Sequence, residues 1–231
     1  MPNPPRRIAI HQPNFAPWCG YFAKAAVCDT FIFLDDVQMS KNSYTNRCQI
    51  VSGNDKKWLT VPVRFSLGDA IQTVEIADPL WGKKHWDRLA ASYKSAAHFS
   101  EIRDLLAGVF LQNSWTRLAP LNIALIRTIA DYLALGTQFV SSSAISHSGT
   151  GDDRLISIMK ALGGATYVSG KGGQNYQDPA KFAGAGIALE VREYAPRPYP
   201  QFDPAFMPGL SIMDALFHLG KGAAALLRYG P

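Results

Sequence analysis

A histidine, His11, directly follows the short apolar run Ile8–Ile10 and is itself followed by Gln12 and Asn14. Imidazole titrates near neutral pH, so a histidine at the end of a strand is a candidate for proton transfer. The two amide side chains offer hydrogen-bond donors and acceptors beside it. This group predicts a general base that acts on an amine or a hydroxyl. The alternative is that His11 only hydrogen-bonds the turn in which it lies.

Two aspartates, Asp35 and Asp36, end a second apolar run, Phe31–Leu34. Adjacent residues of an extended chain point to opposite sides, so we expect one of the two carboxylates to face the site. That carboxylate would orient His11, act as a base itself, or hold a magnesium ion with substrate phosphates. The other would be a cap or turn residue. A zinc site is not expected, because no histidine or cysteine cluster occurs.

Both runs must be strands if they are to bring these side chains together. Pro17 is suited to the first turn of a helix, and the segment 18–27 continues it, so the order is strand, helix, strand. In open α/β sheets, ligands bind at the carboxyl ends of parallel strands. We therefore expect one crevice that contains His11, Gln12, Asn14, Asp35, Asp36 and Gln38.

Further binding residues are expected around this crevice. Lys41, Asn46 and Arg47 lie on the loop after the acidic pair, where Arg47 would bind a carboxylate or phosphate; the alternative is a solvated loop arginine. Trp18 and Tyr21 would form an aromatic wall at the start of the helix.

The segment GKGGQNY, residues 170–176, follows a predicted strand and would cradle an anion with its backbone amides. It has neither the P-loop order nor the GxGxxG spacing, so a plain tight turn is the alternative. We expect Gly170, Tyr176 and Gln201 to reach the rim of the site from the second half of the chain.

Six segments carry a resemblance to a known family: HQPNFAPWCGYFAKA, FIFLDDVQMSKNSYTNR, WLTVPV, YVSGKGGQNY, YPQF and LSIMDALFHLG. In this order they resemble the signature blocks of the WbqC-like protein family, and they span nearly the whole chain. Members lie among enzymes that build bacterial surface polysaccharide, notably the O-antigen of lipopolysaccharide, and others accompany small-molecule and natural-product biosynthesis. A glycine or other acyl transferase role has been proposed for the family.

The resemblance therefore implies a group transferase, with acyl or aminoacyl (glycyl) transfer as the expected reaction. The substrate would be a small-molecule or sugar-linked anion, and a tRNA or carrier protein stays open as the source of the donor; no cofactor is indicated. One alternative is a nucleotidyltransferase-like enzyme that uses a nucleotide and magnesium. Residues 18–21 have the spacing of the HxGH segment of such enzymes, but Trp18 and Tyr21 replace both histidines. The other alternative is a non-catalytic carbohydrate- or partner-binding module.

The composition of the chain limits which of these functions and folds are possible. The 231 residues are 47% hydrophobic and 18% charged, which suits one WbqC-like domain over residues 1–231. The net charge of +5 is scattered rather than gathered in a stripe, so nucleic acid is not the expected partner. No apolar run is long enough for a membrane span, and we expect a soluble, cytoplasmic protein with no membrane partner.

The three cysteines, Cys19, Cys28 and Cys48, are an odd number without metal-ligand spacing, which is typical of reduced thiols. A nucleophilic Cys19 is the alternative to a packed thiol.

The remaining chain predicts an α/β fold of nucleotide-binding type: a mainly parallel central sheet with flanking helices, an antiparallel hairpin and a helical insertion at about 81–135. Further strands are expected at 48–51, 58–63, 71–76, 139–142, 166–169 and 188–194, with Gly53 and Asn54 in the hairpin turn. Helices are expected at 81–93, 100–110, 118–135, 154–162, 179–183 and 210–219, the last with Ser211 as its cap. The proline-rich segment 196–208 should be an extended loop.

Overall fold

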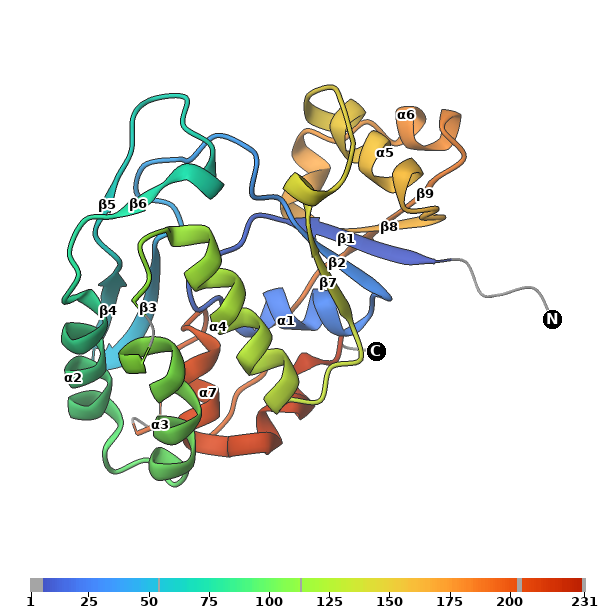
Figure 1. Cartoon of the computed structure of the whole chain (residues 1–231). Coiled ribbons are helices and arrows are strands. Elements are labelled where there is room, and N and C mark those ends of the chain that lie inside the picture. Colours follow the sequence, from blue (N-terminus) through green and yellow to red (C-terminus); the bar gives the residue numbers. More distant parts are fainter. Residues whose placement is uncertain (1–5, 54, 113, 203–204, 230–231) are drawn as a thin grey trace.

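The central sheet has five parallel strands. The computed structural model describes residues 6–53, 55–112, 114–202 and 205–229. Its strands lie in the order β7 (Gln138–Ser141), β2 (Thr30–Phe33), β1 (Arg7–His11), β8 (Thr166–Gly170) and β9 (Ala188–Arg192) (Figure 1). β1 and β2 are parallel neighbours, with His11 opposite Phe33. The expected strand–helix–strand opening and the α/β fold class are confirmed.

Each face of the sheet is covered by its own helices. Ile8 and Ile10 pack in a cluster with Ile158 of α5 (Gly151–Ala161) and Phe182 of α6 (Pro179–Gly184). Side chains alternate along a strand, so His11 points to the opposite face, which α1 (Cys19–Ala26) covers (Figure 1). The strand pattern thus decides that His11 faces α1.

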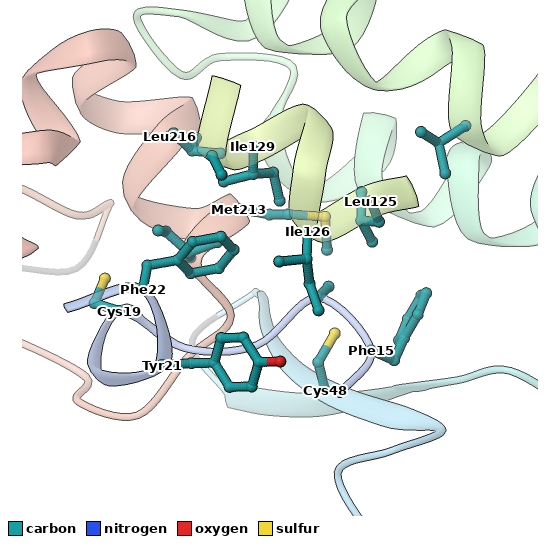
Figure 2. Packing of buried hydrophobic residues seen from close by; sticks show 14 of the residues in the cluster. Phe15, Cys19, Tyr21, Phe22, Cys48, Leu125, Ile126, Ile129, Met213 and Leu216 are labelled. Carbon is teal, nitrogen blue, oxygen red and sulfur yellow. The ribbon is translucent and has the colours of Figure 1, made fainter. Parts of the chain in front are cut away.

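On the side away from the sheet, helix α1 packs against two other helices, α4 (Leu118–Tyr132) and α7 (Ile212–Leu219). Figure 2 shows Phe22 of α1 among Ile126 and Ile129 of α4 and Met213 and Leu216 of α7, all of them fully buried. Burying a side chain of this size contributes roughly 1.5–3 kcal/mol. This packing holds α1 in a fixed position beside the sheet.

The helices α2 (Trp81–Tyr93) and α3 (Phe99–Ala107) precede α4 and complete the helical segment expected near 81–135. The helix predicted at 100–110 ends sooner, because the chain widens into a π-helical turn, η2 (Gly108–Gln112). A final 3₁₀ segment, η5 (Gly220–Leu227), was not predicted.

Two short antiparallel pairs lie outside the central sheet. β3 (Arg47–Ser52) and β4 (Asp55–Thr60) form the expected hairpin; Asn54 of its predicted turn lies outside the described residues. The strand expected at 71–76 is wrong: a 3₁₀ turn, η1 (Ile71–Thr73), precedes a two-residue strand, β6 (Glu75–Ile76), paired with β5 (Val63–Arg64). Ile71 and Val74 are both fully buried, and a spacing of three suits a 3₁₀ turn better than a strand.

The N-cap of α7 and the proline-rich segment before this helix agree with the prediction from the sequence. The Ser211 hydroxyl accepts a hydrogen bond from the Met213 amide and so caps the helix as expected. The described part of the proline-rich segment 196–208 contains no helix or strand.

In the described part of the chain, no helix is both long and apolar enough to cross a membrane.

Candidate functional site

The order of the strands reverses beside β1. The chain runs from β1 to β2 on one side and later returns to place β8 on the other side. Open α/β sheets bind ligands at such a reversal, outside the carboxyl ends of the strands. His11 ends β1 and Gly170 ends β8, so both lie at this point.

The imidazole of His11 is held by a backbone carbonyl. Its Nδ1 atom lies 3.0 Å from the carbonyl oxygen of Gln12, which can only accept a hydrogen bond. Nδ1 therefore carries the proton and Nε2 keeps its lone pair. The Tyr21 ring packs edge-on against the imidazole at 5.0 Å between centroids, and the Tyr21 hydroxyl donates to the same Gln12 oxygen at 3.1 Å.

The surroundings keep this ring uncharged. Burial and the nearby Lys24 ammonium lower the pKa of His11 from its ordinary value to about 3. The neutral imidazole can thus accept a hydrogen bond from a substrate amine or hydroxyl over the whole physiological pH range.

Three cavities meet at His11. The aromatic cavity, of about 420 Å³, is lined by His11, Asn14, Ala16, Pro17, Trp18, Tyr44, Cys48, Gln49, Gly209 and Ser211. The cationic cavity, of about 310 Å³, is lined by His11, Trp18, Gly20, Tyr21, Lys24, Gly170, Lys171, Gly172, Arg192, Glu193, Tyr194 and Tyr229. The large cavity, of about 790 Å³, includes Gln12, Gln38, Arg154, Tyr167, Tyr176 and Gln177. Volumes in this range suit small ligands.

Trp18 lies in the wall that the aromatic and cationic cavities share. Its side chain is 38% exposed, and its indole packs edge-on against Tyr194 at 5.3 Å. Gly20 makes room for it, since a Cβ atom there would lie 2.5 Å from the Trp18 ring. Position 20 therefore needs glycine for steric reasons, although its backbone is ordinary helix.

The turn after His11 is strained and firmly anchored. Ala16 has a φ of 40°, a left-handed conformation that is rare for alanine and still rarer before a proline. The buried Asn122 of α4 donates to the carbonyl oxygens of Pro13 at 2.8 Å and Thr45 at 2.7 Å. Strain of this kind gathers at functional sites, where the surrounding structure holds it in place.

The carboxylates of the acidic pair, Asp35 and Asp36, do not contact His11. The prediction that one of them orients the imidazole is therefore corrected. The Asp35 carboxylate accepts hydrogen bonds from Ser142 and from the amide and hydroxyl of Ser143. Asp36 accepts from Ser142 at 2.6 Å and lies 2.9 Å from Nε2 of His147. The two carboxylates thus tie the end of β2 to η3 (Ser142–Ala144), beyond β7.

Several other predicted residues are also placed elsewhere. The Arg47 guanidinium stacks on Trp58 at 4.1 Å, and Asn46 is buried with its Nδ2 donating to Val61. Lys41 is exposed on the loop. Gln201 donates to the buried Asp214 carboxylate at 2.9 Å. None of these four side chains lines the three cavities at His11.

The structure does bring the other predicted residues to those cavities. Each of the following lines at least one of them: His11, Gln12, Asn14, Trp18, Tyr21, Gln38, Gly170 and Tyr176.

Sequence reasoning missed three cations in the cationic cavity: Lys24, Lys171 and Arg192. One signal could have revealed Lys24. It lies four residues after Gly20 and three after Tyr21, so it shares their helix face, which the apolar pattern marks as buried.

Burial disfavours the thiolate form of all three cysteines. Burial raises the pKa of Cys19, Cys28 and Cys48 to about 12 in each case. A thiol that stays protonated is a poor nucleophile, so the packed-thiol interpretation of Cys19 is the one that the geometry favours.

The parallel sheet with helices on both faces defines an α/β protein, and its cavities at His11 lie at the strand reversal. The model of the WbqC-like protein family matches residues 12–225. A protein of Mycobacterium tuberculosis, Rv1507c, is 35% identical over 227 residues, which cover 97% of this chain and 98% of that protein. The chain belongs to the WbqC-like protein family, as the sequence blocks predicted.

Proposed function

We propose that this protein is a group transferase that moves an acyl or aminoacyl group, such as glycyl, onto an amine or hydroxyl. The acceptor would belong to bacterial surface-polysaccharide biosynthesis, such as that of the O-antigen, or to a related small-molecule pathway. The observation that carries this proposal is that His11 lies where two cavities of different character meet. A transferase needs such an arrangement, because donor and acceptor must reach one proton-transfer group together.

The aromatic cavity suits the acceptor. Trp18 and Tyr44 are 38% and 56% exposed, and aromatic faces of this kind stack on the apolar face of a sugar ring. Asn14 and Gln49 add polar side chains that can bind hydroxyl groups. The cavity thus combines apolar and hydrogen-bonding walls, as a sugar-linked or similar acceptor requires.

The reaction follows from the free Nε2 lone pair. The acceptor amine or hydroxyl donates a hydrogen bond to Nε2 and attacks the acyl carbonyl carbon of the donor. Its proton passes to Nε2 as the new bond forms, and the imidazolium then gives this proton to the leaving group as the bond between the acyl carbon and the leaving group breaks. Atoms and charge balance without a further reactant, and Gln12 holds the ring in place throughout.

The nucleotidyltransferase alternative is less well supported. Its magnesium ion would need Asp35 or Asp36, and both carboxylates already accept hydrogen bonds from Ser142. Calorimetry with ATP and magnesium tests it directly: tight binding that depends on the metal would favour this alternative.

The test is a comparison of polysaccharide and small-molecule precursors by mass spectrometry. A deletion strain should lack an acyl or aminoacyl substituent that the parent strain contains. Wild-type protein and a His98→Gln variant, altered at an exposed histidine, should restore it, whereas His11→Gln should not. Unchanged precursors in the deletion strain would contradict the transferase. Full restoration by His11→Gln would instead favour the binding module.

A further inference from the structure

Lys24 is a buried cation in the wall of the cationic cavity. It is 6% exposed, and its Nζ atom lies 3.5 Å from the Ile10 carbonyl oxygen and 5.7 Å from the centre of the Phe31 ring. Within the described residues, no carboxylate forms an ion pair with it. Burial lowers its pKa to about 8, so it still carries its charge at pH 7. A buried charge without a counter-ion is costly, and a bound anion would offset that cost.

Two further cations surround the same space. Lys171 and Arg192 line it, and Glu193 is the one acidic residue in this lining, paired with Lys171 at 2.5 Å. The Arg192 guanidinium stacks on Tyr229 at 5.1 Å while its Nε atom bonds Glu190. Glu193 and Glu190 thus pair with Lys171 and Arg192, and among the described residues Lys24 is the cation of this lining without a carboxylate partner.

We propose that the cationic cavity binds a phosphate-bearing group, with Lys24 as its buried charge and Lys171 and Arg192 at its rim. Lysine and arginine are the usual partners of phosphate, and the several oxygens of a phosphate can accept hydrogen bonds from Lys24 and from the rim cations at the same time. The volume of about 310 Å³ is large enough for a phosphate with part of the molecule that bears it.

This site also gives the proposed transfer a donor of defined chemistry, and that part of the inference rests on the proposed function. A phosphate beside Lys24 offsets the charge that helps to keep the His11 imidazole neutral. Donor binding would therefore make His11 a stronger base at the moment when the acceptor loses its proton. The binding itself depends on no reaction.

Isothermal titration calorimetry of the whole chain with inorganic pyrophosphate at constant ionic strength tests the site. We expect saturable binding that Lys24→Met weakens at least about tenfold, since a charge-assisted hydrogen bond is lost. Lys171→Met, at a side chain that is 65% exposed, should weaken it less and cannot disturb the core. The control is Lys160→Met, which alters an exposed lysine of α5 and should leave binding unchanged.

Two results would overturn the site: no saturable binding to the wild-type protein, or equal affinity in Lys24→Met, Lys171→Met and wild type. If Lys24→Met does not fold, the Lys171→Met and Arg192→Met variants test the site instead, and unchanged pyrophosphate affinity in both would overturn it. Acetate, titrated under the same conditions, should bind more weakly than pyrophosphate; tighter acetate binding would contradict a phosphate ligand. Because no turnover is measured, the phosphate site can stand or fall independently of the transferase.

Discussion

The indole of Trp18 occupies the space that a Cβ atom on Gly20 would need, 2.5 Å from its ring carbon Cζ2. Since Trp18 stands between the aromatic and cationic cavities, the smallest residue of α1 determines the shape of both. A glycine in a helix normally costs stability, so its presence here has to be explained by this contact.

Gly20→Ala should therefore displace the Trp18 ring and weaken pyrophosphate binding several-fold, while the protein stays folded. Tryptophan fluorescence and calorimetry measure the two effects. The matched control is Gly184→Ala in α6, outside the three cavities at His11, where a Cβ atom meets nothing within 4 Å. Equal effects of the two variants would show that Trp18 does not depend on Gly20.

Two histidines, the partly buried His11 and the buried His85, should make the protein less stable in mild acid. Burial lowers the pKa of His11 to about 3 and that of His85 to about 4, below the unfolded value of 6.5. Between these values and 6.5 the unfolded chain binds more protons, so stability falls as the pH falls through this range. From pH 7.5 to 5 each histidine should contribute a loss of up to about 2 kcal/mol.

Urea unfolding at pH 7.5 and pH 5 checks this expectation. His11→Gln and His85→Gln should each remove part of the loss, whereas His98→Gln, at a 39% exposed side chain, should shift both curves alike. If His11→Gln loses as much stability between pH 7.5 and pH 5 as the wild type does, His11 does not titrate with a lowered pKa.

Lys24→Met should stabilise the protein, because it removes a buried charge. The pKa of Lys24 falls from 10.5 to about 8 on folding, which corresponds to a penalty of about 3 kcal/mol at neutral pH. Between pH 8 and pH 10.5 the unfolded chain binds more protons, so the wild type should gain stability over this range and the variant should not. Thermal unfolding at pH 7 and pH 9.5 measures the difference.

A gain in stability together with a loss of anion binding would mark Lys24 as a residue kept for function. If Lys24→Met were less stable at both pH values, the lysine would be structural.

Asn122→Ala should loosen the turn that carries the site. It removes both donors from the buried carbonyl groups of Pro13 and Thr45, at an expected cost of about 2–4 kcal/mol. Chemical denaturation gives the cost, and hydrogen exchange at Phe15 and Asn46 locates it. The exposed Asn175, replaced by alanine, is the control. A uniform change in exchange over the whole chain would contradict a local role.

The parts of the site that follow local rules were predictable from the sequence. The end of an apolar run at His11, the helix opening at Pro17 and the second run at 31–34 predicted the βαβ unit and the carboxyl end of β1, where the cavities lie. Gln12 and Asn14 follow His11 closely in sequence and line cavities with it, and Trp18 joins them at the start of α1.

The rest depends on tertiary structure. Asp35 and Asp36 follow the strand next to β1, yet they turn toward Ser142 and Ser143, which are distant in sequence. Arg47 was expected on a loop but begins β3, where the neighbouring strand offers Trp58. Lys171 and Arg192 line the same cavity as Lys24 only because β8 and β9 lie on the far side of β1. A single sequence does not reveal this strand order.

The strand order also bears on how the protein is made. β1 leaves the ribosome early but gains its neighbour β8 only after most of the chain has been synthesised, and Tyr229 closes the cationic cavity later still. Contacts between such distant segments form slowly. The nascent chain thus carries His11 before the cationic cavity exists, and a product truncated before β8 would lack Lys171, Arg192 and the strand that pairs with the second edge of β1. Synthesis from the amino end therefore delays completion of this cavity until Tyr229 has been added.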